Sequence, residues 1–355
     1  MARVFAVGGT GFVGSHAVRA CVRAGHEVWV ASEGLRPGLL DDVADRVRFV
    51  PGNLLHWPEL LEGLTASRPE VVVSCAAFGA GDAGLLASAS RHPARAVEVN
   101  VGGFTNLLEA MRLFGVPRLV WTSSSVVFGP ATAYPAAPLD EEAPSAPTTV
   151  YGGTKAMAEC LARHYRREYR LESAALRLPL VYGPGRWYVG QASALHALFT
   201  AAARRQPAVV AAPPEPADLL YAPDAGRAVE ACVSARTLPH DRYHVVGHRS
   251  SLADLARALK EADPDVDVRV EAAPRGAAEA SGLRPERGGA ARGAEPGFTP
   301  GGAEGGREPL MEPSPGGPGL PAMSTARIER DLGFRPEYDA RRAAADFLRW
   351  LRAQG

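Results

Sequence analysis

The sequence has little lysine and no net charge. Only Lys155 and Lys260 are lysines among its 39 basic residues, which balance 39 acidic residues. A protein that binds nucleic acid or an anionic membrane usually carries an excess of basic charge, and this chain has none. We therefore expect a small-molecule partner, with no nucleic acid and no membrane.

Cysteine is scarce, and long hydrophobic runs are missing. The four cysteines lie far apart and form no Cys-x-x-Cys pair, which argues against a zinc site or a disulfide framework, so we expect no metal. No segment reaches the roughly 18 unbroken apolar residues of a membrane span. Met1 to Arg3 lead directly into the first hydrophobic run, without the apolar stretch of a signal peptide. These features predict a cytoplasmic protein.

The chain does have enough apolar side chains for a large core. Its 355 residues are 46% hydrophobic and 22% charged, as in globular proteins. Short β-branched runs alternate with amphipathic stretches, the pattern of a parallel sheet covered on both faces. The sequence therefore predicts an α/β fold, a doubly wound parallel sheet of the Rossmann type, with a smaller C-terminal substrate-binding lobe. The expected strands are 3–7, 27–31, 47–51, 71–75, 118–123, 174–178 and 242–246, the last after a helix capped by Asp224.

A glycine-rich turn follows the first expected strand. Gly8, Gly11 and Gly14 have the spacing that permits a tight turn, close approach of the backbone to a pyrophosphate, and close packing of helix and strand. Amide groups and the helix dipole then face the phosphates. We predict a dinucleotide site here, and its first contacts are Gly8, Thr10, Gly11, Phe12, Val13 and Gly14.

The end of the second expected strand bears on the choice between NADP and NAD. Ser32 and Arg36 suit a 2′-phosphate and favour NADP, whereas Glu33 suits a free ribose hydroxyl and favours NAD. The charge of this short segment slightly favours NADP, with NAD as the alternative.

We expect the chain to divide into two domains that flank the dinucleotide site. Residues 1–178 plus 219–247 form the predicted dinucleotide-binding domain, and residues 179–218 plus 248–355 form the predicted substrate-binding lobe. Within the lobe, residues 271–322 contain 13 glycines and 9 prolines among 52 residues. A core cannot be built from that composition, so we predict a flexible insertion there.

Tyr151 and Lys155 are the most informative polar pair, because four residues apart on a helix they project from the same face. A cation beside the phenol favours the phenolate, which can exchange a proton with a substrate hydroxyl or carbonyl. Three serines, at 123–125, follow the expected strand 118–123, whose carboxyl end lies in the ligand crevice of a parallel sheet. Any one of them can bind the substrate oxygen beside the tyrosine.

Together these motifs resemble those of the extended short-chain dehydrogenase/reductase family, the NAD-dependent epimerase/dehydratase group. The similar segments are 8–14, 52–54, 75–77, 100–103, 123–129, 151–155 and 182–185. The resemblance implies a catalytic trio of Ser124, Tyr151 and Lys155, with Lys155 and Tyr151 also contacting the cofactor, and a homodimer formed through a helix pair. It implies further cofactor contacts from Asn53, Leu54, Ala76, Ala77, Asn100, Pro179 and Val181.

The chain departs from the family pattern at positions that bear on the substrate. Ser125 and Val126 stand where sugar 4,6-dehydratases of the family have an acidic pair, which disfavours a dehydratase. Leu180 replaces an asparagine that typically contacts the diphosphate of a nucleotide sugar, and Ala217 lies near the position of an arginine. These replacements argue against an ordinary nucleotide-sugar site.

Four other residues lie where the resemblance places closure of the lobe on the substrate. Arg177, Arg186, Trp187 and Tyr188 either supply replacement anion and stacking contacts or belong to packing and the surface.

The sequence thus predicts an enzyme, an NAD(P)-dependent oxidoreductase that interconverts a secondary alcohol and a ketone on a sugar-like or polyhydroxylated small molecule. The alternative is a (nucleotide-)sugar epimerase whose tightly bound NAD is recycled within each turnover. Because both reactions use the same residues, motifs do not separate them. A third interpretation, a dinucleotide-sensing protein without catalysis, is disfavoured because Tyr151 and Lys155 are intact.

Overall fold

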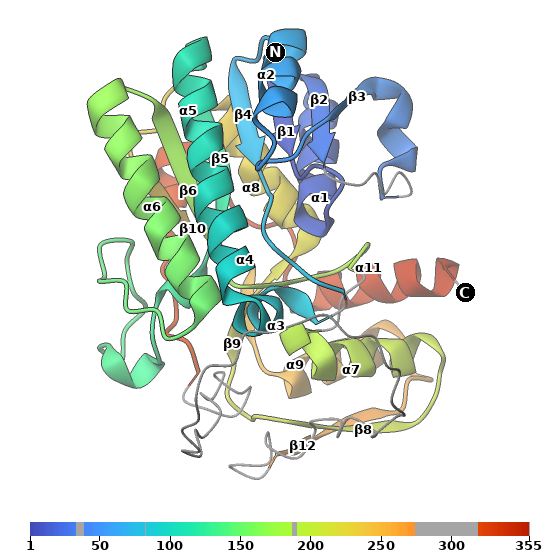
Figure 1. Ribbon diagram of the computed structural model, residues 1–355. Coiled ribbons are helices and arrows are strands. Elements are labelled where there is room, and N and C mark those ends of the chain that lie inside the picture. The colour runs from blue at the N-terminus through green and yellow to red at the C-terminus, as the bar shows by residue number, and fades with distance from the viewer. Residues whose placement is uncertain (33–38, 82, 187–189, 274–318, 355) are drawn as a thin grey trace, which may run out of the picture.

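A seven-stranded parallel sheet forms the centre of the protein (Figure 1). The structure, a computed structural model, describes residues 1–32, 39–81, 83–186, 190–273 and 319–354. The strand order is β10-β6-β5-β4-β1-β2-β3, and every neighbouring pair in this sheet is parallel. The chain winds outward in both directions from β1, which confirms the predicted doubly wound α/β fold.

The seven strands begin and end within two residues of the predicted positions. Runs of valine, leucine and aromatic residues favour extended backbone and fill both faces of a covered sheet, so their limits are readable from the sequence. The strands are β1 (Arg3–Val7), β2 (Glu27–Ser32), β3 (Val47–Pro51), β4 (Val71–Ser74), β5 (Arg118–Ser124), β6 (Glu172–Leu178) and β10 (Arg242–His244).

Helices cover both faces of this sheet. One face buries α1 (Phe12–Arg23) and α8 (Ala222–Ser234), and the other buries α2 (Trp57–Ser67), α5 (Phe104–Phe114) and α6 (Val150–Tyr169). In Figure 1, α5 and α6 lie in front of the sheet and α8 behind it. Shorter helical segments are η2 (Asp41–Arg46), α3 (Gly84–Arg91), α4 (Pro93–Val97), η3 (Glu98–Gly103), η4 (Ser125–Val127) and η5 (Ala131–Ala133).

Helices α1 and α8 pack in direct contact. A Cβ atom on Gly226 would lie 2.3 Å from the carbonyl oxygen of His16, so only glycine allows this approach. Helix α8 begins at Ala222 with Tyr221 as its N-cap, and Pro223 occupies its first turn. The prediction that Asp224 caps this helix is therefore wrong, because Asp224 already lies inside that turn.

A second core lies beyond the carboxyl ends of the main strands. It is built on small sheets, with β7 (Leu180–Tyr182), β9 (Ala217–Tyr221) and β11 (His248–Ser250) in one and β8 (Ala208–Ala212) and β12 (Val268–Ala272) in the other. Tyr182, Phe199 and Phe347 contact one another at its centre. Its helical segments are η6 (Gly190–Ala192), α7 (Ser193–Ala203), α9 (Leu252–Ala262) and α11 (Ala340–Ala353), while α10 (Ala326–Leu332) packs on the main sheet. The division of the chain into two domains stays a prediction.

The predicted insertion at 271–322 falls mostly outside the described residues, which omit 274–318. Its limits need correction, because Glu271 and Ala272 belong to strand β12. At the other end, Gly319 accepts a hydrogen bond from the Ala131 amide, and Ala322 accepts one from the Leu139 amide. Both ends are thus tied to ordered segments. No helix in the described part of the chain is long and apolar enough to cross a membrane.

Candidate active site

The glycine turn between β1 and α1 has the geometry of a phosphate-binding loop. Gly8 has a φ of +72°, and a Cβ there would lie 2.8 Å from the amide nitrogen of Ala76. A Cβ on Gly14 would lie 2.1 Å from the carbonyl oxygen of Gly8. A side chain at either position would collide with backbone, so glycine is required for the tight turn that leaves the first helical amides of α1 at the carboxyl edge of the sheet. The residues present fit a dinucleotide.

The other predicted residues of the turn follow this geometry. Gly11 is the N-cap of α1, Thr10 and Phe12 are buried, and Val13 is half-buried. Ala76 and Ala77, which follow β4, lie beside the turn, because the amide of Cys75 bonds the Val7 carbonyl at the end of β1. The structure thus brings the turn and the segment after β4 together.

The residues predicted to select NADP are only partly described. Ser32 is the last residue of β2, and Arg36 lies outside the described residues. The neighbouring strand approaches closely, since a Cβ on Gly52 would lie 2.4 Å from the Ala31 side chain. Asn53 accepts a bond from the Leu55 amide at 2.8 Å, and Leu54 is buried. Both of these predicted contacts lie beside the end of β2.

Asn100 links the cofactor side of the site to the catalytic helix. Its Oδ1 accepts from the Phe78 amide at 2.7 Å, and its Nδ2 donates to Thr154 Oγ1 at 3.1 Å. It lies in η3, a short π-helical segment, a conformation that is frequent at functional sites. The segment after β4 and the start of α6 are therefore held at a fixed separation.

Helix α6 presents Tyr151 and Lys155 on one buried face. Thr149 caps it by accepting from the Gly152 amide, and Tyr151 and Lys155 are only 6% and 4% exposed. The Lys155 ammonium donates to the Thr122 carbonyl at 2.8 Å and lies 5.7 Å from the centre of the Tyr151 ring. Burial lowers the pKa of Lys155 to about 8, against the charges of Cys75 and Glu159, which raise it. The pair thus places a cation beside the phenol.

Strand β5 delivers the three serines, and the structure distinguishes them. Ser123 is buried and donates to Glu159 at 2.6 Å, and Ser125 is buried in η4. Ser124 ends β5, is half-buried, and accepts from the Val126 amide at 3.4 Å. Ser124 is thus the most accessible of the three, and its catalytic role stays a prediction.

The segment after β6 returns to the start of α1. His16 bonds the carbonyl of Pro184 at 3.0 Å, and Arg186 lies over the Phe12 ring at 5.8 Å. Arg186 also donates to the carbonyl of Val181. Pro179 and Val181 are therefore close in the chain to a segment that reaches the glycine turn.

Arg177 does not face a substrate. Its side chain is fully buried in an ion pair with Glu159 at 2.7 Å. Of the two predictions for this residue, packing is correct. Arg186 contacts Phe12, as described, and Trp187 and Tyr188 lie outside the described residues.

Sequence reasoning missed Glu159 itself. It lies four residues after Lys155, and that continuation of the Tyr151–Lys155 spacing was the available signal. A glutamate on a helix that also carries many exposed charges gives no other indication of burial.

A parallel sheet with a glycine turn after β1 and a buried Tyr/Lys pair on α6 defines a dinucleotide-binding protein with the residues for proton transfer. The chain belongs to the NAD dependent epimerase/dehydratase family, whose model matches residues 4–247. This confirms the predicted membership of the extended short-chain dehydrogenase/reductases, a family of enzymes.

Curated relatives are similar over part of their length. "Protein CapI" of Staphylococcus aureus is 30% identical over 190 residues, which cover 51% of this chain and 55% of that protein. A UDP-glucose 4-epimerase of Lacticaseibacillus casei is 30% identical over 171 residues, 48% of this chain and 49% of that protein. The chain spans about half the length of these relatives.

Among solved structures, the Thermus thermophilus UDP-glucose 4-epimerase in complex with NAD has a TM-score of 0.73 and 22% identity, covering 99% of both chains. The L-threonine dehydrogenase of Clostridium difficile has a TM-score of 0.76 and 18% identity, covering 100% of this chain and 99% of its own. At these identities the likeness shows the shared fold.

Proposed function

We propose that the protein epimerises a secondary alcohol of a sugar-like or polyhydroxylated small molecule by way of the corresponding ketone, with Tyr151 as acid and base. The observation that carries this proposal is the buried Lys155 ammonium, 5.7 Å from the Tyr151 ring on the same helix face. In this role Tyr151 takes a proton from the substrate hydroxyl or returns one to the carbonyl, Lys155 stabilises the phenolate, and Ser124 hydrogen-bonds the reacting oxygen.

The cofactor in this proposal is a nicotinamide dinucleotide. The turn from Gly8 to Gly14 holds its pyrophosphate, Asn53 and Leu54 lie on the adenine side, and Ala76, Ala77, Asn100, Pro179 and Val181 line its path to Lys155. When bound, its nicotinamide ring supplies the redox chemistry. The family description favours NAD, while Arg36, with Ser32 near it, favours NADP by its positive charge. Titration of the protein with NADH and with NADPH would decide which of the two dinucleotides it prefers.

Of the two predicted reactions, we place epimerisation first. Two of the first curated relatives are UDP-glucose 4-epimerases, and each is similar to about half of this chain. The substrate class is kept broader than a nucleotide sugar, because Leu180 packs against the core of the second lobe, where the family has an asparagine. Net oxidation or reduction of a comparable small molecule is the second candidate.

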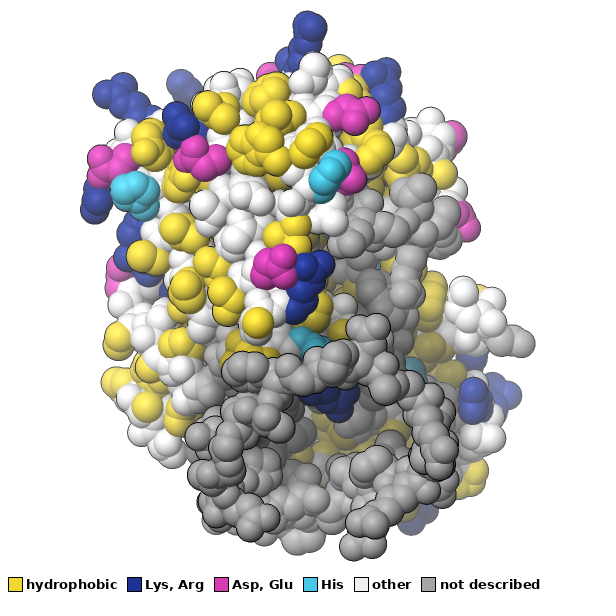
Figure 2. All heavy atoms as spheres, viewed as in Figure 1, with side chains coloured by type: hydrophobic (Ala, Val, Ile, Leu, Met, Phe, Trp, Pro, Cys, Tyr) yellow, Lys and Arg dark blue, Asp and Glu magenta, His cyan; other side chains and the backbone are white. Residues whose placement is uncertain are grey.

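We also propose a homodimer formed by α5 and α6. Large apolar side chains are exposed there, with Leu113 59%, Met157 50% and Tyr169 49% exposed. Figure 2 shows hydrophobic side chains over the region where Figure 1 places α5 and α6. A symmetric pair of these helices would cover them. The cytoplasmic location and the two-domain division remain predictions beside this proposal.

The first experiment is to denature freshly purified protein and identify any released dinucleotide. Stoichiometric NAD would support the epimerase, whose cofactor is not exchanged. Protein that emerges empty and binds NADPH more tightly than NADH would support the reductase and the Ser32/Arg36 assignment. Tyr151→Phe should then reduce turnover at least about 100-fold while dinucleotide affinity stays nearly unchanged. Retained turnover in this variant would refute the proposed mechanism.

A further inference from the structure

Glu159 extends the catalytic face of α6 by one turn. Tyr151, Lys155 and Glu159 follow one another at intervals of four residues, so their side chains lie along one side of the helix. The Glu159 side chain is 4% exposed. It faces the sheet, where a carboxylate is stable only if it is paired and hydrogen-bonded.

Two adjacent strands supply the partners of this carboxylate. Ser123 of β5 donates its hydroxyl to Oε1 at 2.6 Å. Arg177 of β6 donates from Nε to Oε1 at 2.9 Å and from Nη2 to Oε2 at 2.7 Å. Ser123 and Arg177 are direct register partners in the sheet. One carboxylate therefore fastens α6 to both strands at the same level.

Arg177 is itself held from several sides. Its guanidinium lies 4.9 Å from the centre of the Phe128 ring, and its Nη1 donates to the Glu141 carbonyl at 3.4 Å. The two parallel hydrogen bonds between Arg177 and Glu159 fix the relative orientation of the two side chains as well as pairing their charges. Buried ion pairs add little net stability compared with apolar residues of the same volume, so orientation is what this pair contributes.

The fastening point lies next to the proposed catalytic groups. Ser124 follows Ser123, and Lys155 lies one helical turn before Glu159. The carbonyl that accepts from the Lys155 ammonium belongs to Thr122, the residue before Ser123. A displacement of α6 along β5 would therefore change the separation of Ser124 from Tyr151 and Lys155.

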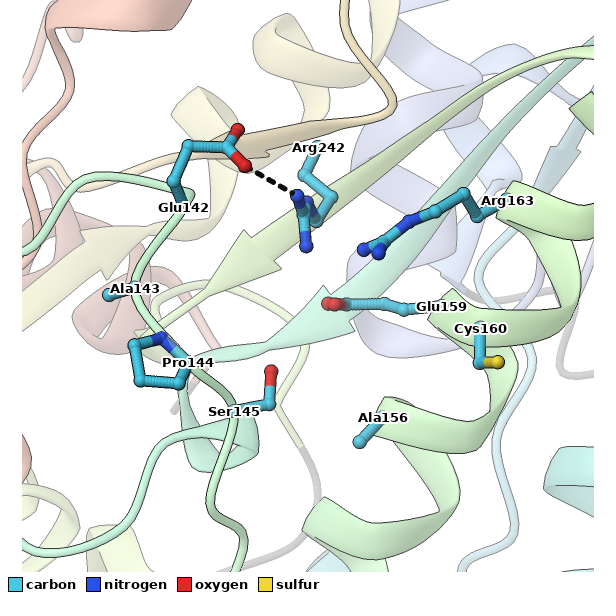
Figure 3. A pocket seen from close by; sticks show the side chains of 9 residues that line it. All are labelled: Glu142, Ala143, Pro144, Ser145, Ala156, Glu159, Cys160, Arg163 and Arg242. Atoms are coloured by element: carbon cyan, nitrogen blue, oxygen red, sulfur yellow. Dashed lines mark hydrogen bonds and ion pairs between the residues drawn. The ribbon is translucent and has the colours of Figure 1, made fainter. Parts of the chain in front are cut away.

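A cavity borders Glu159. It has a volume of about 350 Å³ and is lined by Glu142, Ser145, Cys160, Arg163 and Arg242 among others. Figure 3 shows Glu159, Arg163 and Arg242 pointing toward one another, with Glu142 paired to Arg242. Arg163 and Arg242 also pair with Asp241. Glu159 thus borders a cavity whose volume exceeds that of a small anion.

We propose that Glu159 is a positioning residue, which holds α6 against Ser123 and Arg177 so that Tyr151 and Lys155 face Ser124 at a working distance. This inference rests on the proposed function for its effect on turnover. The effect of Glu159 on Lys155 does not depend on any substrate. The role of Glu159 and the proposed function can therefore be refuted separately.

The first test uses the scarcity of lysine. In protein labelled with ¹³C-lysine, only Lys155 and Lys260 give signals, and Lys260 is the internal reference. The charged and titratable groups that face Lys155 are Cys75, Tyr151 and Glu159. Glu159→Gln removes the carboxylate, so the pKa of Lys155 should fall below its wild-type value. An unchanged Lys155 titration would overturn the coupling, whether or not a substrate is known.

The matched control lies on the same two strands at their opposite ends. Glu172 of β6 pairs with its register partner Arg118 of β5 at 2.6 Å. Glu172→Gln removes a comparable carboxylate far from Ser124, so the Lys155 titration and turnover should stay at wild-type values. Equal effects of the two substitutions would show a general loss of stability and refute a positioning role. If Glu159→Gln does not fold, Ser123→Ala removes one hydrogen bond from the same carboxylate but keeps its charge, so turnover should fall while the Lys155 pKa stays near its wild-type value. Wild-type turnover in a folded Ser123→Ala variant would contradict the positioning role.

The second test is chemical rescue. Glu159→Ala joins the vacated space to the cavity and leaves Arg177 without its carboxylate. We expect kcat to fall about 10-fold to 100-fold with KM nearly unchanged, and sodium formate to restore part of kcat in a saturable manner. Chloride at equal ionic strength should not. The proposal would be refuted if folded Glu159→Ala kept the wild-type kcat, or if its kcat fell and formate did not raise it. Tyr151→Phe tests the proposed function separately.

Discussion

Asp224 of α8 and Tyr338 of the C-terminal segment are joined by a hydrogen bond of 2.9 Å from the Tyr338 amide to Oδ2. Oδ1 accepts from the Glu337 amide at 3.0 Å and from Arg227 at 2.8 Å. The carboxylate is fully buried. It therefore holds the segment before α11 against the first turn of α8.

Asp224→Ala should destabilise the protein by about 1–3 kcal/mol, because it removes the acceptor that the Glu337 and Tyr338 amides share and one of the partners of Arg227. Urea unfolding measures this. The control is Glu98→Ala, which removes an exposed pair with Arg95 and should change the free energy of unfolding by less than about 0.5 kcal/mol. Similar losses in both variants would contradict the anchoring role.

Two neighbouring glycines of α6 should respond in opposite directions to alanine. A Cβ on Gly152 would lie 2.2 Å from the Val126 carbonyl oxygen, whereas Gly153 has nothing within 4 Å. Gly152→Ala should displace α6 and cost about 1–3 kcal/mol. Gly153→Ala should stabilise the helix by about 0.5–1 kcal/mol. Thermal unfolding of the two variants checks this, and destabilisation by Gly153→Ala would show that the exposed side of α6 is constrained.

Stability should fall in mild acid. Burial lowers the pKa of His16 and His248 to about 4, and burial together with Arg177 lowers that of His244 to about 3. Above about pH 6.5 these histidines are neutral in both states. Below about pH 6.5 these histidines become protonated in the unfolded chain but stay neutral in the folded protein. The free energy of unfolding therefore decreases from about pH 6.5 toward pH 4.

The slope should approach about 4 kcal/mol per pH unit if all three histidines contribute. Urea unfolding across this range measures it. His248→Gln should remove about one third of the slope, because burial is what keeps the ring of His248 neutral in the folded protein and glutamine does not titrate. Stability independent of pH in this interval would show that these side chains become protonated in the folded state.

Thiol reactivity should single out one cysteine. Cys160 is exposed, Cys21 and Cys232 are buried, and burial raises the pKa of Cys75 to about 12. A thiolate is the reactive form, so Ellman's reagent should modify Cys160 rapidly and the others only after unfolding. Cys160→Ser is the matched control and should abolish the rapid phase. A second rapid thiol in the folded protein would contradict the packing around α1, β4 or α8.

Much of the main sheet was predictable from local pattern. Strands β1 and β3 begin and end at the predicted residues, because alternating valine and aromatic side chains specify extended backbone within a few residues. The glycine turn and the Tyr/Lys pair were equally visible, since their chemistry depends on short, fixed spacings.

The remainder depends on contacts between distant segments. Strands β8 and β12 pair although they are far apart in the sequence, and the residues of neither strand indicate which other strand it pairs with. Arg177 and Glu159 read as ordinary charged residues, and only the packing of α6 on β5 and β6 shows that they neutralise each other in the interior. The helix start at Ala222 was missed because Asp224 is a good cap by type, while the backbone had already turned helical before it.

The close packing of α8 on α1 has a consequence for synthesis on the ribosome. The surface of α1 that receives Gly226 is made early, and its covering helix leaves the exit tunnel only after most of the chain has been translated. Until then the nascent N-terminal half exposes Val18, Cys21 and Val22, which the finished protein buries. Chaperone dependence during translation should therefore end once α8 emerges, rather than when the first six strands are complete.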